Sequence, residues 1–247
     1  MTFGSLFSGI GGIDLGLERA GMECRWQVEI DPYCRKVLAK HWPDVRRYED
    51  VREVGSDNLK PVDLIAGGFP CQDVSTAGKK AGIKEGTRSG LWFEFHRIIC
   101  ELRPRYVFVE NVPGLLANGM GRVLGDLAEI GYDAEWEVLS AADVGAPHLR
   151  KRVWIMAYPD STGRQEQRRA EPVEQEQRPA ERSCSEMADP NSSDKPSRHE
   201  ENWWSTEPNV GRVAHGVPKR VDRLKGLGNA VVPQCAEWIG RHIHQLG

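Results

Sequence analysis

The chain has 247 residues, a formal net charge of -3 at pH 7 and 39% hydrophobic residues, enough to bury one full domain and a small second one. No apolar run is long enough to span a bilayer, and the first residues lack the basic start of a secretory signal. The six cysteines contain no CxxC pair, which disfavours a zinc site or a redox dithiol. We therefore expect a soluble cytoplasmic protein that needs no metal.

Residues 1–157 alternate short apolar runs with helical patterns. Six runs are predicted to be strands: 3–8, 24–30, 62–68, 105–111, 134–141 and 152–158. Helices are predicted at 11–21, 31–42, 91–102 and 122–132. This succession predicts an α/β fold, with a twisted, mostly parallel sheet and helices on both faces. Ligands of such sheets bind beyond the carboxyl ends of the strands.

The composition changes abruptly after Tyr158. The next stretch, 159–202, is rich in glutamine, glutamate, arginine, proline and serine, and it cannot build a core of its own. The apolar pattern then resumes, and the chain ends with a Gly-Asn turn and an amphipathic helix. The sequence therefore predicts a large domain from 1–157 and 216–247, and a short polar region, 158–215, that is partly disordered on its own.

Basic residues gather in two segments of this mildly acidic chain. Between residues 76 and 90, one glutamate accompanies four basic residues: Lys79, Lys80, Lys84 and Arg88. A second basic segment begins at Arg212 and ends at Lys225. The overall charge disfavours a protein that coats nucleic acid, whereas two local basic segments favour contact with an anion on one face.

A glycine-rich turn connects the first predicted strand to the first helix. Its glycines are Gly9, Gly11 and Gly12. Such a turn lets the backbone approach a ligand closely, or it only packs tightly. Glu29, after the next strand, is placed to accept hydrogen bonds from ribose hydroxyls, and Asp50 is a candidate for an adenine amino group. Because Asp14 replaces a glycine of the dinucleotide motif, ribose and adenine without a pyrophosphate fit better.

Cys71 follows a buried strand in the stretch GGFPCQDVS. A buried thiol is the usual fate of an intracellular cysteine. This one lies at a strand's carboxyl end, Pro70 restricts the backbone before it, and a basic segment follows. Positive charge lowers the pKa of a thiol and increases the fraction of thiolate at neutral pH. The position therefore favours a nucleophile.

Glu110 follows four apolar residues of another predicted strand, in the stretch VENVPG. An unpaired carboxylate is costly to bury there, so it either forms a structural ion pair or serves as an acid. Arg150 and Arg152 alternate onto one side of a later strand and could pair with it. Cys71, Glu110 and an arginine from three strand ends are thus predicted to share one pocket.

Five motifs occur in a characteristic order: FSGIGG, GGFPCQDVS, ENVPG, HLRKRVW and GLGNAVVP. In these motifs the chain resembles the DNA cytosine-5-methyltransferases of bacteria and phages, over about residues 1–157 and 216–245. The resemblance implies the Rossmann-like fold of S-adenosylmethionine-dependent methyltransferases for the large domain. It also implies that 158–215 is the target-recognition region and that the C-terminal helix packs on the N-terminal part.

The resemblance further implies a covalent mechanism on a cytosine flipped out of double-stranded DNA. Cys71 would add to carbon 6 of the ring, and Glu110, supported by Arg152, would stabilise the protonated ring. Methyl transfer to carbon 5 would leave S-adenosylhomocysteine. The implied catalytic set is completed by Pro70 and Arg150.

The family motifs also imply binding residues. Glu29 would contact the ribose, Ile30 and Val51 the adenine faces, and Asp50 the adenine amino group. The implied cofactor-binding set is Phe7, Gly9, Ile10, Gly11, Gly12, Glu29, Ile30, Asp50, Val51, Asn229 and Val231. The implied DNA-binding set is Ser75, Lys79, Lys80, Arg88 and Arg212.

Two features depart from the family pattern. His148 replaces the usual glutamine, and the target-recognition region is short for reading bases in the major groove. Trp203 and Trp204 either contact bases there or anchor the segment to the core. Expected partners are DNA and a cognate restriction endonuclease, for a monomeric enzyme. The alternatives are a non-catalytic DNA-binding relative and a nicotinamide oxidoreductase, which Asp14 disfavours.

Overall fold

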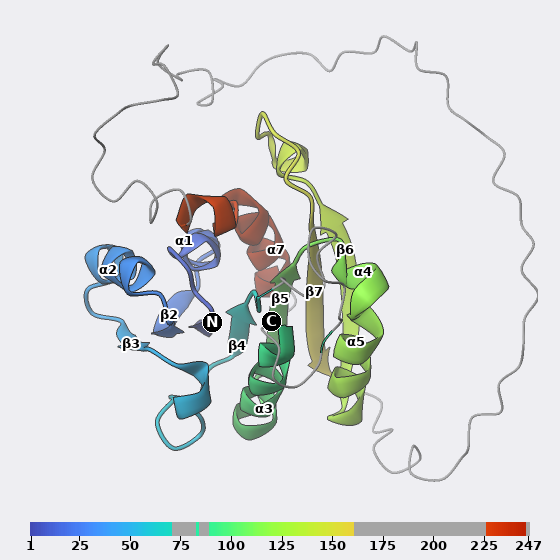
Figure 1. The fold of residues 1–247 in the computed structure, drawn as a ribbon, viewed down its shortest axis with the longest axis horizontal. Helices are drawn as coiled ribbons and strands as arrows, with labels where there is room; N and C mark the ends of the chain where they lie inside the picture. Colours follow the sequence, from blue (N-terminus) through green and yellow to red (C-terminus); the bar gives the residue numbers. More distant parts are fainter. Residues whose placement is uncertain (71–82, 84–88, 161–225, 246–247) are drawn as a thin grey trace, which may run out of the picture. The chain divides into compact units, whose positions relative to one another are not determined.

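The computed structural model describes residues 1–70, 83, 89–160 and 226–245 (Figure 1). Seven strands form one sheet in the order β3-β2-β1-β4-β5-β7-β6. Their bounds are β1 Thr2–Leu6, β2 Glu23–Val28, β3 Arg46–Tyr48, β4 Leu64–Gly67, β5 Tyr106–Asn111, β6 Tyr132–Leu139 and β7 Arg152–Pro159. The pairings from β3 to β5 are parallel, and β7 runs antiparallel between β5 and β6. The expected mostly parallel sheet is confirmed.

The helices lie close to their predicted positions. The α-helices are α1 Gly12–Arg19, α2 Pro32–His41, α3 Trp92–Leu102, α4 Leu115–Asn118, α5 Met120–Glu129 and α7 Pro233–Gln245. Short 3₁₀ turns are η1 Val51–Glu53, η2 Ser89–Leu91 and η3 Ala141–Val144. Local chemistry sets one boundary clearly: the Asp31 carboxylate caps α2 by accepting hydrogen bonds from the Tyr33 and Cys34 N–H groups, and Pro32 opens the helix.

The side chains of the parallel strands pack alternately into two separate hydrophobic cores, one on each face of the sheet. One core combines Ile65 and Val107 with α3 and α5 side chains such as Phe95 and Val123. The other combines Leu64 and Phe108 with side chains of α1 and α7. Consecutive strand residues therefore point to opposite layers, as a sheet covered on both faces requires.

The described residues of 1–160 and 226–245 belong to one compact unit. None of the helices in this described part combines the length and apolar character needed to span a bilayer. The predicted domain boundary at 157 lies inside β7, and the one at 216 lies outside the described residues, so the division into two domains stays a prediction.

Helix α7 packs directly on α1, so the two ends of the described chain share one layer. A glycine makes this approach possible. A Cβ atom added to Gly16 would lie 2.6 Å from the Ala236 Cβ and would also collide with the Pro233 carbonyl oxygen. Backbone atoms cannot move aside as a flexible side chain can, so the two helices would have to separate.

We expect Gly16→Ala to lower the free energy of unfolding by about 1–3 kcal/mol, the usual cost of overpacking. Gly125→Ala is the matched control, because this exposed α5 glycine has no heavy atom within 4 Å of the added Cβ. There the gain in helix propensity should raise stability by up to about 1 kcal/mol. Denaturant titration of both variants measures whether the free energy of unfolding falls in Gly16→Ala and rises in Gly125→Ala. Equal effects would show that α1 and α7 do not pack this closely.

Candidate cofactor and active site

The glycine-rich turn after β1 adopts left-handed backbone conformations. Gly9 and Gly11 have φ values of 57° and 86°, and Phe7, which is not a glycine, has a φ of 53°. A left-handed non-glycine residue costs about 1–3 kcal/mol and is often found at a ligand site. A Cβ added to Gly9 would meet no heavy atom within 4 Å, so the backbone at Gly9 borders open space.

The Glu29 carboxylate ties this turn to the end of β2. One of its oxygens accepts a hydrogen bond from the Gly9 N–H at 2.7 Å, and the other accepts one from the Asp31 N–H at 2.8 Å. Each carboxylate oxygen has further lone pairs for other donors. The contact fixes the predicted ribose-binding carboxylate against the predicted glycine loop.

The residues predicted for the adenine lie on the two neighbouring strand ends. Ile30 is 63% exposed, so its side chain offers an apolar surface next to Glu29. Asp50 caps η1, and its carboxylate accepts hydrogen bonds from the Arg52 side chain and N–H group, which lower the pKa of Asp50. Val51 is buried beneath it.

The segment before α7 returns to the glycine turn. The Val231 carbonyl oxygen lies 2.5 Å from where a Cβ on Gly12 would stand, and Gly226 lies beside the Ile10 side chain. Val231 is half-buried, whereas Asn229 is exposed. The structure thus brings Val231 close to the glycine turn, and contact of Val231 and Asn229 with a cofactor stays a prediction.

Glu110 lies almost buried at the end of β5 and forms an ion pair with Arg152 of β7. The distance from Arg152 Nε to Glu110 Oε1 is 2.7 Å, and the two side chains are 20% and 12% exposed respectively. Burial raises the pKa of Glu110, against the opposing charges of Arg152 and Arg150. A raised pKa favours the neutral form of a buried carboxyl group, and carboxyl groups perturbed in this way are common at functional sites.

The segment that leads to Cys71 passes directly beside Glu110. A Cβ on Gly68 would lie 2.7 Å from Glu110 Oε2, so only a glycine leaves room for the carboxylate. The neighbouring Asn111 donates a hydrogen bond from Nδ2 to the Phe69 carbonyl oxygen at 3.1 Å. Pro70 follows, half-buried. The chain is therefore held against β5 up to the residue before Cys71.

Arg150 approaches the same region from the start of β7 and donates a hydrogen bond from Nη1 to the Gly228 carbonyl oxygen at 3.1 Å. It therefore connects the Glu110 side of the site to the C-terminal segment. His148, at the family's glutamine position, is exposed. Several predicted residues lie outside the described residues: Cys71, Ser75, Lys79, Lys80, Arg88, Trp203, Trp204 and Arg212. Their roles stay predictions.

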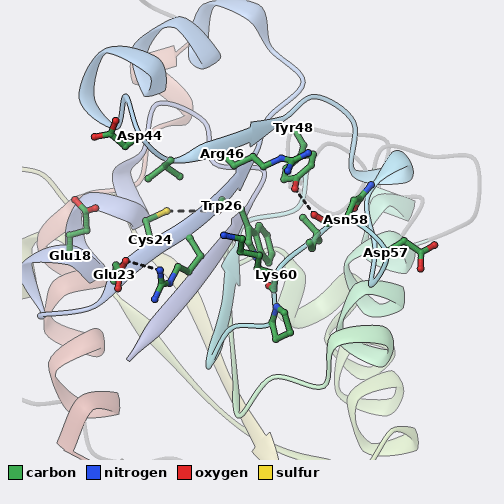
Figure 2. A pocket seen from close by; sticks show the side chains of 14 residues that line it. Glu18, Glu23, Cys24, Trp26, Asp44, Arg46, Tyr48, Asp57, Asn58 and Lys60 are labelled. Carbon is green, nitrogen blue, oxygen red and sulfur yellow. Dashed lines mark hydrogen bonds and ion pairs between the residues drawn. The ribbon is translucent and has the colours of Figure 1, made fainter.

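A groove of about 630 Å³ lies elsewhere, beside the amino-terminal half of β2 (Figure 2). Acidic residues such as Glu18 and Asp44 and basic residues such as Arg46 and Lys60 line it together. None of the predicted site residues belongs to this groove. The mixed charge selects no particular ligand.

Asp14, the residue that departs from the dinucleotide motif, is fully buried at the start of α1. Its carboxylate accepts hydrogen bonds from Ser5 Oγ at 3.0 Å and Gln27 Nε2 at 2.8 Å. Burial nevertheless raises the pKa of Asp14 to about 6, against the lowering effect of these two bonds. The motif gave no signal for this cluster, because it depends on β1 and β2 lying side by side.

We expect Asp14→Asn to stabilise the protein at pH 8. The raised pKa means that ionised Asp14 destabilises the fold by up to about 3 kcal/mol, at 1.36 kcal/mol per pKa unit. The stabilisation of the fold by protonated Asp14 is fully present below pH 3.8 and is lost as the pH rises through about 6. The advantage of the variant should therefore shrink between pH 6 and pH 4.

Melting temperatures measured from pH 4 to pH 8 check this expectation. Asp44→Asn, at an exposed position, is the control and should show no such pH dependence. A constant difference between Asp14→Asn and the wild type would mean that Asp14 does not titrate in this range.

Comparison with known proteins agrees with this arrangement. The family model for C-5 cytosine-specific DNA methylases matches residues 1–217. The chain belongs to this family. Its sheet order and two helical layers are those of the Rossmann-like, S-adenosylmethionine-dependent methyltransferases.

Several curated type II methyltransferases are similar to this chain in sequence. The type II methyltransferase M2.BsuMI of Bacillus subtilis is 40% identical over 161 residues, which cover 62% of this chain and 41% of the relative. M.HhaI of Haemophilus parahaemolyticus is 33% identical over 162 residues, 64% of this chain and 49% of the relative. The chain therefore spans about half, or less, of the length of these curated relatives.

Solved structures agree on the fold. A protein described as a DNA modification methyltransferase encoded within an Escherichia coli prophage superposes with a TM-score of 0.55 at 29% identity, covering 64% of this chain and 47% of that one. A Spodoptera frugiperda DNMT2 variant reaches 0.56 at 22% identity, covering 69% and 53%, and supports the fold alone.

Proposed function

We propose that this member of the C-5 methylase family transfers a methyl group from S-adenosylmethionine to carbon 5 of a cytosine in double-stranded DNA. The observation that carries the proposal is the Glu110–Arg152 ion pair, which lies against Gly68, three residues before Cys71. An acid with a raised pKa is thus held next to the segment that bears a candidate nucleophile.

The described residues fit the cofactor. The open backbone at Gly9, the Glu29 carboxylate and the exposed Ile30 offer close approach, hydrogen-bond acceptors and an apolar surface in one place. S-adenosylmethionine, when bound, supplies an electrophilic methyl group. Glu29 would hold the ribose hydroxyls, Asp50 would accept from the adenine amino group, and Ile30 and Val51 would border the ring.

The protein's own groups would activate the cytosine. The Cys71 thiolate would form a bond to carbon 6, which makes carbon 5 nucleophilic. Glu110 would hold the ring nitrogen and the exocyclic amino group, and Arg152 would keep the carboxyl group in place. Loss of the carbon-5 proton, with breakage of the bond between sulfur and carbon 6, would return the thiolate. Because a duplex hides both carbons, the base must first be flipped out.

DNA containing 5-fluorocytosine tests this proposal, because fluorine cannot leave as a proton does. Purified protein, labelled S-adenosylmethionine and such a duplex should give a protein–DNA adduct that survives denaturant. Sequencing the trapped DNA would identify the target. No adduct, together with normal S-adenosylhomocysteine binding, would support the alternative, a non-catalytic DNA-binding relative.

The partners belong to the same proposal. We infer that 158–215 reads the target sequence, that Ser75, Lys79, Lys80, Arg88 and Arg212 contact DNA, and that the enzyme acts as a monomer. The relatives' names as type II methyltransferases support a role beside a cognate restriction endonuclease. Protection of the trapped target sequence from a nuclease of the same host would test that role.

A further inference from the structure

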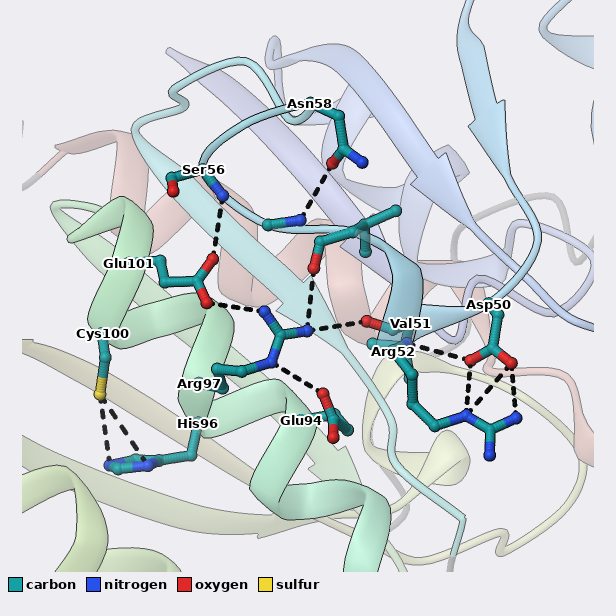
Figure 3. A network of polar contacts seen from close by, with 12 residues as sticks. Asp50, Val51, Arg52, Ser56, Asn58, Glu94, His96, Arg97, Cys100 and Glu101 are labelled. Atoms are coloured by element: carbon teal, nitrogen blue, oxygen red, sulfur yellow. Dashed lines mark hydrogen bonds and ion pairs between the residues drawn. The ribbon is translucent and has the colours of Figure 1, made fainter.

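Arg97, in the middle of α3, reaches across to the segment that follows β3 (Figure 3). Its Nη2 atom donates hydrogen bonds to the carbonyl oxygens of Val51 at 3.0 Å and Val54 at 2.8 Å. Val51 is one of the residues expected to border the adenine. Arg97 lies on α3, which carries none of the predicted cofactor residues, and these two hydrogen bonds reach only Val51 among them.

Two glutamates of the same helix hold the guanidinium group. Glu94 Oε2 accepts from Arg97 Nε at 2.8 Å, and Glu101 Oε1 accepts from Arg97 Nη1 at 2.7 Å. The second oxygen of Glu101 accepts a hydrogen bond from the Ser56 N–H at 2.9 Å. Arg97 and Glu101 therefore bind three backbone groups between residues 51 and 56, and Glu94 holds the guanidinium group in place.

This segment has little regular structure to fix it. Its only helical turn is the three-residue η1, although the Val51 and Val54 side chains are only 5% and 3% exposed. Carbonyl groups in such a place need hydrogen-bond partners, and here the guanidinium group supplies them. A planar fork of donors suits two carbonyls and two carboxylates at once, whereas a lysine ammonium group presents its donors from one point.

We propose that Arg97 is a positioning residue for the adenine end of the cofactor site. It holds the Val51 backbone, and through it Asp50, at the distance from Ile30 that an adenine ring requires. The inference rests on the proposed function, because it assigns the adenine to these walls. It goes beyond that function because Arg97, which lies outside the cofactor site, would determine how well the site recognises the adenine of the cofactor.

The test compares binding of S-adenosylhomocysteine with binding of its inosine analogue, in which a carbonyl group replaces the adenine amino group. Wild-type protein should prefer the adenine form, since the Asp50 carboxylate can accept a hydrogen bond from the amino group but not from the carbonyl oxygen that replaces it. Arg97→Gln should weaken S-adenosylhomocysteine binding by about tenfold, or 1.4 kcal/mol. Binding of the inosine analogue should weaken less, so the preference for the adenine form over the inosine form should become smaller. KM for S-adenosylmethionine should rise while kcat and KM for DNA stay near wild-type values.

Arg122→Gln is the matched control. Arg122 of α5 also forms an ion pair within its own helix, with the buried Asp126 at 2.8 Å, and its hydrogen bonds in the described part of the chain do not involve residues 50–56. This variant should melt earlier than wild type but keep the full preference for the adenine form. A shared loss of preference would show that general destabilisation, and not the Arg97 contacts, is responsible.

Arg97→Lys keeps the charge but not the fork, and it serves if Arg97→Gln does not fold. A reduced preference in this variant supports the proposal as well. A wild-type preference in either folded variant would overturn it. Failure of the wild-type protein to bind S-adenosylhomocysteine at all would instead refute the proposed function, so the two failures are distinguishable.

Discussion

Cys71→Ser is expected to abolish methylation, lowering kcat by more than about a thousandfold, while S-adenosylhomocysteine binding stays at the wild-type level. A serine hydroxyl is far less acidic than a thiol, so almost no oxyanion is present to add to carbon 6. Methyl transfer from labelled S-adenosylmethionine to duplex DNA measures the first effect. Calorimetric titration measures S-adenosylhomocysteine binding. We expect binding to persist because the residues proposed to bind the cofactor lie on other strand ends.

Cys100→Ser is the control for this variant. Cys100 is an exposed cysteine on α3, near the His96 imidazole at 3.8 Å, and it takes no part in the proposed site. It should leave methylation and the fluorocytosine adduct unchanged. Full methylation activity of Cys71→Ser would show that the Cys71 thiol is not the nucleophile.

Glu110→Gln is expected to lower kcat by about a hundred- to ten-thousandfold, the usual contribution of a positioned acid or base. The amide keeps the shape of the side chain beside Gly68 but cannot give or take the proton, and Arg152 loses its ionic partner. Binding of S-adenosylhomocysteine should change little. Steady-state kinetics on duplex DNA would measure the loss.

Glu137→Gln provides the matched control for that loss. Glu137 of β6 pairs with Trp154 on one side of β7, and Glu110 pairs with the same residue on the other side. Glu137 is exposed, so its charge should not matter for kcat. If Glu110→Gln retained wild-type kcat, the Glu110–Arg152 pair would be a structural ion pair only.

Much of the fold could be predicted from apolar runs. β4 and β5 carry continuous apolar residues because both faces of the sheet are covered, and the helices show one apolar stripe each. β3, with the residues Arg46–Tyr48, has no such run, because it is a short edge strand in which only one side pairs. The antiparallel direction of β7 also left no local signal in its residues.

The site was predictable where it follows strand ends, and hidden where it depends on distant contacts. Glu110 and Arg152 stand at the ends of apolar strands, so their ion pair could be anticipated. The bonds from Arg97 to Val51 and Val54 join residues more than forty positions apart, and arginine–glutamate spacing on a helix ordinarily indicates a solvated surface. Only the packing of α3 against η1 distinguishes the two cases.

A connecting segment, 161–225, joins the end of β7 at Pro159 to Gly226, which lies beside the Ile10 side chain of the glycine turn. The seven-stranded sheet and the two cores described above are built by residues on both sides of this segment. The entropic cost of closing a connection grows slowly, by about 0.6 kcal/mol for each doubling of its length. Under the proposed function, a change in the length of the connecting segment, and with it in the choice of DNA sequence, would therefore cost the fold that carries Glu29 and Glu110 little.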